Sequence, residues 1–360
     1  MKIYIAGAHS RGTTMGYYLQ YLDSSTEILA YLYDNDEENP SEVNGVPVIK
    51  IDENTKLDTS SRVYLGTRGV NHPHLIASLK KCGMKDIVPV DVKLDQEIRN
   101  QYLRKYFASI GREYTKLDEL CVWEPNGNEN GQSAKVYVAG SAYDKPLQNP
   151  YELKDYEKLI QVGTDLSEKR LDTDCFDNMG ENISNRNSQF CELTGLYWIW
   201  KHAKEEIVGL VHYRRHFTIP EDWKARMVQN NIDVILPLPL YVAPSLEKNF
   251  RSRHVGANLD IMYDYLRENE LEDYEAVSEF LKNTALYSPC NMFIMRREIL
   301  NELCNWMFPI LFAVAEKGGI LEDSYQNRYP GFISERLITY YFEKFRNKYK
   351  VIYADKNFLY

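Results

Sequence analysis

Short β-rich runs alternate with helical runs along most of this chain, and the alternation restricts the folds that it can adopt. In the first part, the β-rich runs are 2–6, 27–33, 62–65 and 86–90. A second series begins near residue 134, with strands at 135–139, 159–162, 207–211, 234–236, 290–295 and 351–353. Helical segments are predicted near 187–204, 258–266, 274–281, 299–315 and 333–346. Both parts are therefore predicted to be α/β, and the first to contain a doubly wound parallel sheet.

The chain is long enough for two domains. Its 360 residues, 44% of them hydrophobic, can bury two cores of ordinary size. Residues 117–133 are polar and rich in glycine and asparagine, which is typical of a loop or linker. We therefore predict a first domain at 1–115, a linker at 116–133 and a second domain at 134–360.

Charge, cysteines and hydropathy narrow the class of protein. The net charge of −9 argues against nucleic-acid binding. Six cysteines without a C-x-x-C pair indicate reduced thiols of an intracellular protein. The amino terminus enters a strand rather than a signal peptide, and the longest apolar stretch, 306–315, is about half of a membrane-spanning helix. We expect a cytoplasmic protein without a transmembrane segment.

The turn after the first strand contains glycines close to the start of a helix. Gly7 and Gly12 precede a helical run at 15–22, where backbone amides can bind a phosphate. Their spacing departs from G-x-G-x-x-G, so a tight turn without a ligand is equally compatible. Asp34 follows the second strand, where a dinucleotide-binding fold holds a ribose hydroxyl, although a solvated turn also suits an aspartate. These three are the candidate cofactor-binding residues.

Polar residues cluster before the predicted helix 187–204. Asn182, Ser184 and Asn187 can cap free amides at the helix start, and capping accounts for one of them. The remaining side chains have the donors and acceptors that bind a sugar or nucleotide. Asp177, just upstream, could accept hydrogen bonds from hydroxyl groups.

An apolar strand ends in four cationic or potentially cationic side chains. His212-Tyr213-Arg214-Arg215-His216 follows strand 207–211, and open α/β sheets bind ligands at the carboxyl ends of strands. Guanidinium groups bind phosphate oxygens bidentately and offset charge on a departing diphosphate. The alternative is that both arginines pair with some of the 52 acidic residues. We favour a sugar diphosphate as the ligand and leave the role of His216 open.

Two further candidates lie toward the carboxyl end. His254 follows Arg251 and Arg253 in a predicted loop that either clamps phosphates or is solvated. Glu335 stands at the predicted start of helix 333–346, where the helix dipole favours the ionised carboxylate. An ionised carboxylate suits a general base, and an acid with only a helix-start role fits equally.

Several motifs together resemble one bacterial family. They are 177–184, 192–194 with 197–201, 209–215, 291–294 and 334–337. That family, long described as a domain of unknown function, occurs in capsular and O-antigen polysaccharide clusters and is assigned to the glycosyltransferases. The resemblance covers about 134–360. The first domain, with a hairpin at 44–48, resembles the small Rossmann-like amino-terminal domain of bacterial sugar-modifying enzymes.

The resemblance implies a GT-A-like domain that transfers a hexosyl group of galactose type from a UDP-sugar. The acceptor would be an oligosaccharide or lipid-linked glycan in capsular polysaccharide, exopolysaccharide or O-antigen synthesis. His212, Arg214 and Arg215 would stabilise the diphosphate, and Glu335 would be the acceptor's base if the anomeric centre inverts. The predicted substrate contacts are Asp177, Asn182, Ser184, Asn187, Tyr213, His254 and Asn291.

GT-A enzymes usually hold a divalent metal with Asp-x-Asp at the end of a strand. Here that place holds the segment 212–215, and Asp172-Thr173-Asp174 lacks a preceding apolar strand. We therefore assign no metal ligand and expect arginines to neutralise the leaving group. Manganese or magnesium stays open as a cofactor.

Two other classes of protein stay open. An oxidoreductase or epimerase acting on nucleotide sugars through the first domain would bind a nicotinamide cofactor, and the imperfect glycine spacing weakens this alternative. A non-catalytic glycan-binding module built on the 28 tyrosines and five tryptophans would bind oligosaccharides without a nucleotide sugar, and the basic strand end argues against it. A lipid-linked acceptor would bring the protein to the inner face of the plasma membrane.

Overall fold

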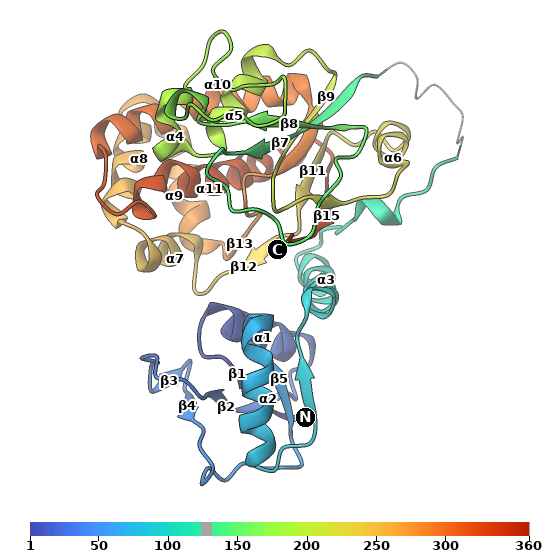
Figure 1. Ribbon diagram of the computed structural model, residues 1–360, viewed down its shortest axis with the longest axis vertical. Coiled ribbons are helices and arrows are strands. Elements are labelled where there is room, and N and C mark those ends of the chain that lie inside the picture. Colours follow the sequence, from blue (N-terminus) through green and yellow to red (C-terminus); the bar gives the residue numbers. More distant parts are fainter. Residues whose placement is uncertain (124–131, 360) are drawn as a thin grey trace. The chain divides into compact units, whose positions relative to one another are not determined.

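The computed structural model describes residues 1–123 and 132–359 (Figure 1). The chain forms two compact units, Met1–Tyr114 and Thr115–Tyr360, and each has its own sheet and core. Both units are α/β, as the alternation of strands and helices predicts.

The first unit is built on a six-stranded sheet. Its strands are β1 (Lys2–Ala6), β2 (Glu27–Tyr33), β3 (Glu42–Val43), β4 (Val46–Lys50), β5 (Arg62–Leu65) and β6 (Ile87–Pro89), in the order β3-β4-β2-β1-β5-β6. Neighbouring strands are parallel except for the hairpin of β3 and β4. The helices are α1 (Ser10–Leu22), α2 (His72–Lys81) and α3 (Val92–Ser109). The apolar runs of β1 and β5 are almost fully buried, as expected for central parallel strands.

The second unit is built on a seven-stranded mixed sheet in the order β10-β15-β11-β14-β9-β7-β8. Its strands are β7 (Ala134–Gly140), β8 (Glu157–Gln161), β9 (Ile207–His212), β10 (Phe217–Thr218), β11 (Val234–Pro237), β14 (Phe293–Arg296) and β15 (Val351–Lys356). β14 runs antiparallel to both of its neighbours, β9 and β11, whereas β7, β8 and β9 are parallel. The carboxyl ends of β7, β9 and β11 therefore share one edge of the sheet with the amino end of β14.

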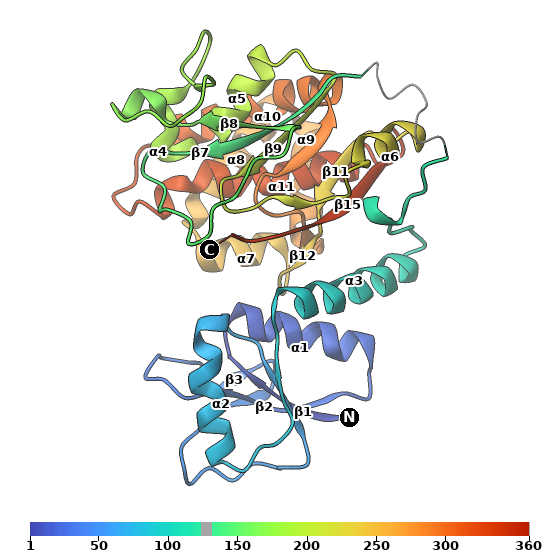
Figure 2. The same cartoon turned by 45° about the vertical axis from the view of Figure 1, so that its right-hand side comes forward.

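This sheet is buried on both faces. On β7, Tyr137 and Ala139 enter the larger core while Val136 and Val138 enter the smaller one, which is the two-residue period of a strand. Helices α10 and α11 pack into the larger core (Figure 2), and α6 packs into the smaller one. The helices are α4 (Asn187–Phe190), α5 (Leu193–His202), α6 (Trp223–Gln229), α7 (Leu246–Arg253), α8 (Gly256–Asn269), α9 (Leu271–Asn283), α10 (Arg297–Gly318) and α11 (Tyr329–Lys344). A separate two-stranded sheet joins β12 (Leu240–Tyr241) and β13 (Leu286–Tyr287).

Two predicted helices have different bounds in the structure. The helix predicted at 187–204 is interrupted, because Cys191 between α4 and α5 adopts a φ of 47° and a ψ of −125°. A residue in that conformation cannot continue a helix. α11 begins at Tyr329, with Pro330 in its first turn where the missing amide is tolerated. Glu335 therefore lies in the second turn of α11 and not at its start.

Helix α10 satisfies the length and composition of a membrane span. It is the one helix within the described ranges to do so, with 22 residues and an 18-residue window of mean hydropathy 1.2. Of that window, 56% is buried inside the protein. Leu303, Met307 and Leu311 are fully buried in the larger core. A helix at the centre of a packed unit can have the same length and apolar composition as a membrane span.

The segment predicted as a linker, 116–133, is described at 116–123 and 132–133, and 124–131 lie outside the described residues. Lys116 forms an ion pair with Asp355 at 2.5 Å, and Leu117 enters the smaller core. Arg226 of α6 donates to the carbonyl of Leu120 at 2.6 Å. Residues 116–120 therefore belong to the second unit.

Candidate active site

The segment 212–215 forms a tight hairpin turn at the end of β9. The amide of His212 donates to the carbonyl of Arg215, and the amide of Arg215 donates to the carbonyl of His212, each at 3.0 Å. Residues that face each other in such a pair project their side chains to the same side. Tyr213 and Arg214 occupy the tip. The predicted cationic cluster therefore divides into two pairs, His212 with Arg215 and Tyr213 with Arg214.

The described carboxyl-terminal residues fasten this hairpin. The amide of Asn357 donates to the carbonyl of His216 at 3.0 Å, and its side-chain oxygen accepts from the His216 amide at 2.9 Å. The amide of Leu359 donates to the carbonyl of Arg214 at 2.8 Å. The backbone that carries both arginines is thus fixed by hydrogen bonds from a second segment.

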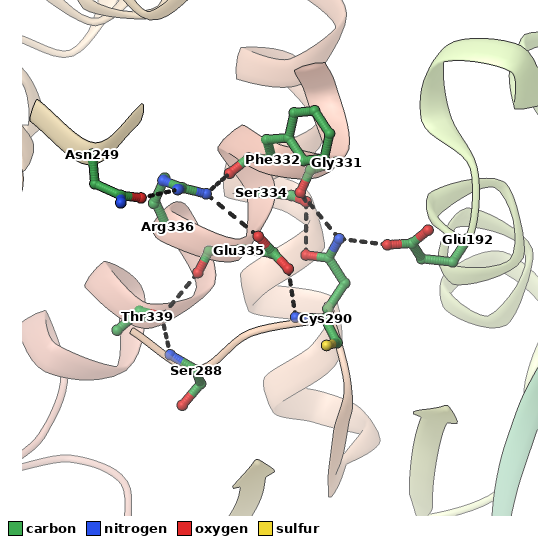
Figure 3. Close-up of polar contacts among 11 residues, drawn as sticks. Glu192, Asn249, Ser288, Cys290, Gly331, Phe332, Ser334, Glu335, Arg336 and Thr339 are labelled. Carbon is green, nitrogen blue, oxygen red and sulfur yellow. Dashed lines mark hydrogen bonds and ion pairs between the residues drawn. The ribbon is translucent and has the colours of Figure 1, made fainter. Parts of the chain in front are cut away.

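A chain of hydrogen bonds connects β9 to α11 at this edge of the sheet. Nε2 of His212 lies 2.5 Å from the carbonyl oxygen of Cys290, and the Cys290 amide donates to Oε1 of Glu335 at 2.5 Å (Figure 3). A carbonyl oxygen only accepts, so Nε2 of the neutral ring carries the proton and Nδ1 presents a lone pair. Burial lowers the pKa of His212, and the nearby Arg215 lowers it further. His212 is therefore a neutral residue that positions Cys290.

Glu335 has the electrostatic character of a general base. Its side chain is only 15% exposed, and burial raises the pKa of its carboxyl group. The Arg336 guanidinium, 3.4 Å from Oε2, opposes this rise, as does the more distant Arg215, while Glu192 adds to it. A helix-start position would let the dipole favour ionisation of Glu335, as predicted, but in the second turn of α11 burial dominates and moves the pKa upward. A carboxylate with a raised pKa binds a proton near neutral pH more readily than an exposed one.

A second carboxylate, Glu192, is held beside Glu335 by a buried amide. Nδ2 of Asn291 donates to Oε1 of Glu192 at 2.8 Å and to the carbonyl of Gly331 at 3.1 Å. Oδ1 of Asn291 accepts from the hydroxyl of Ser334 at 2.8 Å (Figure 3). The predicted substrate contact Asn291 is 3% exposed, and in this structure it orients Glu192.

Backbone strain concentrates at the same place. Cys191, Cys290 and Asn291 all have positive φ, at 47°, 78° and 50°. Conformations of this kind cost about 1–3 kcal/mol for a non-glycine residue and cluster at functional sites. Cys191 precedes Glu192, and Cys290 carries the amide that binds Glu335. The strained residues are therefore adjacent to, or bonded to, both carboxylates, and the hydrogen bonds around them must hold these conformations.

Two arginines approach these carboxylates without forming an ion pair with them. Within the described residues, the side chain of Arg215 forms no ion pair and lies over the ring of Phe358 at 5.4 Å. Arg328 donates from Nε to the sulfur of Cys191 at 3.1 Å and likewise pairs with no described carboxylate. Both charges lie close enough to lower the pKa of His212. Arg215 is half-buried and Arg328 is exposed, and cations without an ion-pair partner are suited to an anionic ligand.

Tyr213 and Arg214 face a different segment, the loop after β7. Nη2 of Arg214 donates to the carbonyl of Lys145 at 3.2 Å. Burial raises the pKa of Asp144 in this loop, and Arg214 partly opposes the rise. Arg214 therefore braces residues 141–145, while Arg215 faces the Glu335 side of the hairpin.

Asp177, predicted to contact a substrate, is fully buried in a network of its own. Its Oδ1 accepts from the Thr164 amide at 3.0 Å and the Ser184 hydroxyl at 2.6 Å. Its Oδ2 accepts from the Gly163 amide at 2.8 Å and the Thr194 hydroxyl at 2.6 Å. All four acceptor positions are occupied, so Asp177 and Ser184 hold the loop after β8 onto α5 and leave no lone pair for a ligand in this conformation.

Asn182 and Asn187 support the same loop. Oδ1 of Asn182 accepts from the Ser184 amide at 3.0 Å, and its Nδ2 donates to the Gly180 carbonyl at 2.7 Å. Nδ2 of Asn187 donates to the Cys191 carbonyl at 2.7 Å, which secures the strained residue before Glu192. Both asparagines therefore act on the site through the backbone.

The remaining histidine candidates lie in different surroundings. His254 stacks on Phe332 with 3.9 Å between ring centroids, and burial together with Arg336 lowers its pKa to about 4. It is neutral at pH 7 and does not clamp a phosphate by charge. His216 is 1% exposed, and its Nδ1 lies 2.7 Å from the buried carboxylate of Glu157.

Two of the candidate residues of the first unit, Gly7 and Gly12, lie where β1 turns into α1, and the third, Asp34, follows β2. Gly7 has a φ of 118°, and a Cβ on Gly12 would lie 1.9 Å from the carbonyl oxygen of Gly7. Close packing of the two segments thus requires these glycines. Asp34 accepts from the Ser78 hydroxyl at 2.8 Å and contacts Nδ1 of His74 at 2.7 Å. Their role in cofactor binding stays a prediction.

The sequence analysis did not select Glu192, Cys290 or Arg328 as site residues. Glu192 was visible only as part of a family motif, and Cys290 acts through its backbone, for which side-chain chemistry gives no signal. Across the described ranges, no group of three or more histidine, cysteine, aspartate or glutamate side chains is arranged to hold a metal ion. A metal bridged by a diphosphate needs fewer protein ligands than that, so its presence is a question for titration.

Comparison with known proteins gives a structural match and a local sequence match. The apo structure of WbbM, a bifunctional glycosyltransferase, aligns with a TM-score of 0.55 at 24% identity over 63% of this chain and 45% of WbbM. The chain thus spans less than half of WbbM, and the likeness is one of fold. A cysteine–tRNA ligase from Methanococcus maripaludis is 33% identical over 113 residues, which are 30% of this chain and 23% of the ligase. The chain therefore matches about a quarter of that relative.

The family comparison covers most of the second unit. Residues 141–348 match the family described as a domain of unknown function, DUF4422. The matched region contains the hairpin of segment 212–215, both carboxylates of the candidate site, and Arg328. More than half of the sequence lies within this match, and the chain belongs to the DUF4422 family.

Proposed function

We propose that the second unit is a glycosyltransferase that moves a hexosyl group of galactose type from a UDP-sugar to a glycan acceptor. The observation that carries this proposal is a buried carboxylate of raised pKa, Glu335, with Arg215 near it and Arg328 near the second carboxylate, Glu192; neither arginine has an ion-pair partner within the described residues. A base beside an anion-binding pair is what transfer from a sugar diphosphate requires. The fold that the unit shares with WbbM, a glycosyltransferase, supports the same reading.

The proposed reaction inverts the anomeric centre. Glu335 takes the proton of the acceptor hydroxyl as its oxygen bonds to the anomeric carbon of the donor. The bond from that carbon to the diphosphate oxygen breaks, and its electron pair leaves with UDP. Arg215, with Arg328, offsets the charge on the departing diphosphate. A neutral His212 ring with a lone pair at Nδ1 does not attract phosphate oxygens. We therefore assign His212 a positioning role, in which it holds Cys290 and through it Glu335.

The wider setting of this proposal follows from the sequence resemblance. A GT-A-like arrangement would place the donor at the carboxyl edge of β7 and β9, and the product would be a capsular polysaccharide, exopolysaccharide or O-antigen. A lipid-linked acceptor would bring a cytoplasmic enzyme to the inner face of the plasma membrane. An oxidoreductase or epimerase acting through the first unit is the rival, and binding of a dinucleotide would favour it.

The two arginines of the hairpin should differ in their effect on turnover. Arg215→Ala should lower kcat about 100-fold, because it removes a charge that offsets the leaving diphosphate. Arg214→Ala should act mainly on the KM of the donor, because Arg214 braces the loop 141–145. Steady-state kinetics with UDP-galactose, or with the UDP-sugar found in a donor screen, measure both. If neither variant changes turnover, the assignment of the leaving-group site is wrong.

UDP and one UDP-sugar should raise the melting temperature of the protein. A ligand at 100 times its dissociation constant stabilises the folded state by about 2.7 kcal/mol, which shifts Tm by several degrees. Differential scanning fluorimetry with and without manganese checks this and reports whether a metal is needed. NADH is the matched control, and a response to NADH alone would move the function to the first unit.

A further inference from the structure

Three aromatic side chains form a continuous surface beside α11. They are Tyr325, Phe332 and His254, and we call them the aromatic ridge. The ring of His254 stacks on Phe332 at 3.9 Å with an angle of 21° between planes, and the ring of Tyr325 lies 5.1 Å from Phe332. Tyr325 is 53% exposed and Phe332 is half-buried. The exposed ring of Tyr325 extends the stacked pair of His254 and Phe332 to the protein surface.

The aromatic ridge is continuous with the candidate active site. Phe332 and Glu335 are three residues apart on α11, which puts their side chains on the same face of the helix. Arg336 joins them, because its Nη1 donates to the Phe332 carbonyl at 2.7 Å and lies 3.4 Å from Oε2 of Glu335 (Figure 3). A group bound on the aromatic ridge therefore has the Glu335 carboxylate as its neighbour.

The chemistry of the aromatic ridge suits a neutral sugar. Aromatic rings offer a flat apolar face with polar edges, and a pyranose ring offers an apolar C–H face with hydroxyls around it. Since burial and Arg336 lower the pKa of His254 to about 4, the stacked ring is uncharged at neutral pH. The three rings themselves carry no charge at neutral pH, and the Arg328 guanidinium, 6.0 Å from the centroid of Phe332, marks the edge of the aromatic ridge toward the diphosphate site.

The donor and the acceptor need separate places around the base. The charged diphosphate is directed to Arg215, which stands on the hairpin at the end of β9. On that side, Glu335 accepts a hydrogen bond from the Cys290 amide. Phe332 of the aromatic ridge lies on the same helix as Glu335. The aromatic ridge offers sugar-binding chemistry on the helix that carries Glu335.

Resting on the proposed transferase function, we propose that the aromatic ridge is the acceptor subsite. A neutral hexose ring of the acceptor glycan stacks on Tyr325 and Phe332 and presents one hydroxyl to Glu335. This assigns the acceptor a terminal hexose with an unobstructed apolar face, and it leaves the diphosphate of the donor to the arginines.

Saturation-transfer NMR on the full chain tests this assignment with methyl β-D-galactopyranoside and methyl α-D-mannopyranoside as probes. The wild-type protein should transfer magnetisation to the ring C–H protons of at least one hexoside. Tyr325→Ala and Phe332→Ala should each weaken its binding about fivefold, the loss expected for one stacking contact. Tyr325→Phe should bind like the wild type. Ile320→Ala is the matched control, since Ile320 is a 79% exposed side chain in the same loop.

Binding of UDP and UDP-galactose to the same variants separates the two proposals. Unchanged UDP affinity together with lost hexoside binding supports the acceptor subsite. Hexoside binding that ignores Tyr325→Ala and Phe332→Ala, or a wild type that binds neither hexoside, overturns it while UDP-galactose binding keeps the transferase. A wild type that binds no UDP compound overturns the transferase instead. The exposed position of Tyr325 keeps Tyr325→Ala folded, so its result counts even if Phe332→Ala unfolds.

Discussion

Replacing Glu335 with glutamine is expected to lower kcat for glycosyl transfer by about 10³-fold, within the range found for removing a general base. Glutamine keeps the shape of the side chain and a carbonyl oxygen that accepts from the Cys290 amide. It cannot take a proton from the acceptor hydroxyl. The affinity for UDP should stay unchanged, because the diphosphate is assigned to Arg215. Single-turnover kinetics and calorimetric titration of UDP measure the two quantities separately.

The pH dependence gives this prediction a second readout. Burial raises the pKa of Glu335, so activity should be lost as the pH falls through a value above the ordinary glutamate range. The residual rate of Glu335→Gln should lack that acid limb. The variant should also be at least as stable as the wild type above neutral pH. A folded-state pKa above the unfolded one means that ionisation of Glu335 removes stability as the pH rises.

Glu343→Gln is the matched control for this variant. It makes the same chemical change on the same helix, where Glu343 pairs with Arg346 at 2.7 Å and its side chain is 28% exposed. Full turnover by Glu335→Gln would exclude Glu335 as the base. Glu192→Gln would then be the next variant to test, because Glu192 is the other carboxylate of the site.

Asp177→Ala is expected to destabilise the protein by about 3–5 kcal/mol, the usual cost of removing one partner from a buried charged network. The substitution leaves two amides and two hydroxyls without their acceptor, those of Gly163, Thr164, Ser184 and Thr194. Each unpaired buried donor costs about 1–3 kcal/mol, so the summed cost of four donors can exceed the expected destabilisation. The expected value therefore assumes that the structure relaxes in part around the substitution. Thermal unfolding should show a fall in Tm of about 10 °C.

Asp174→Ala provides the comparison. Asp174 belongs to the nearby Asp172-Thr173-Asp174 segment, is 83% exposed and pairs with Lys158 at 3.0 Å. A surface pair of this kind contributes at most about 1 kcal/mol, so Tm should move little. If Asp177→Ala melted normally but lost UDP-galactose binding, Asp177 would return to the substrate-contacting role that the sequence suggests.

The longer strands were predictable because each is a short apolar run between polar turns, whereas the two-residue strands β10, β12 and β13 were not predicted. The run 207–211 becomes β9, and its position at the centre of the sheet follows from burial on both faces. The same reasoning selected the hairpin of segment 212–215, since charge at a buried strand end is unusual. Glu335 was also selected, but for a reason that the structure replaces: α11 starts earlier than periodicity indicated, and burial rather than the helix dipole sets the direction of its pKa shift.

The rest of the site depends on contacts between distant parts of the chain. Cys290 and Glu335 are 45 residues apart, and Asn291 and Glu192 are 99 apart. Local sequence patterns do not predict contacts between residues so far apart in the chain. Asp177 illustrates the converse, because a polar residue in a polar loop reads as available for ligands until its four donors are located. The helix break at Cys191 was not predicted, because the helical spacing of apolar residues continues on both sides of it.

The hairpin at the end of β9 makes the geometry of the site depend on the number of residues between His212 and Arg215. His212 and Arg215 face each other only because two residues separate them. Over evolutionary time, insertion or deletion of a single codon between them would turn Arg215 away from Glu335, whereas the identity of residue 213 is far less constrained. Homologues that catalyse this reaction should therefore differ in the identity of these residues but keep the two-residue spacing. A change in the length of this segment would indicate that the reaction has been lost.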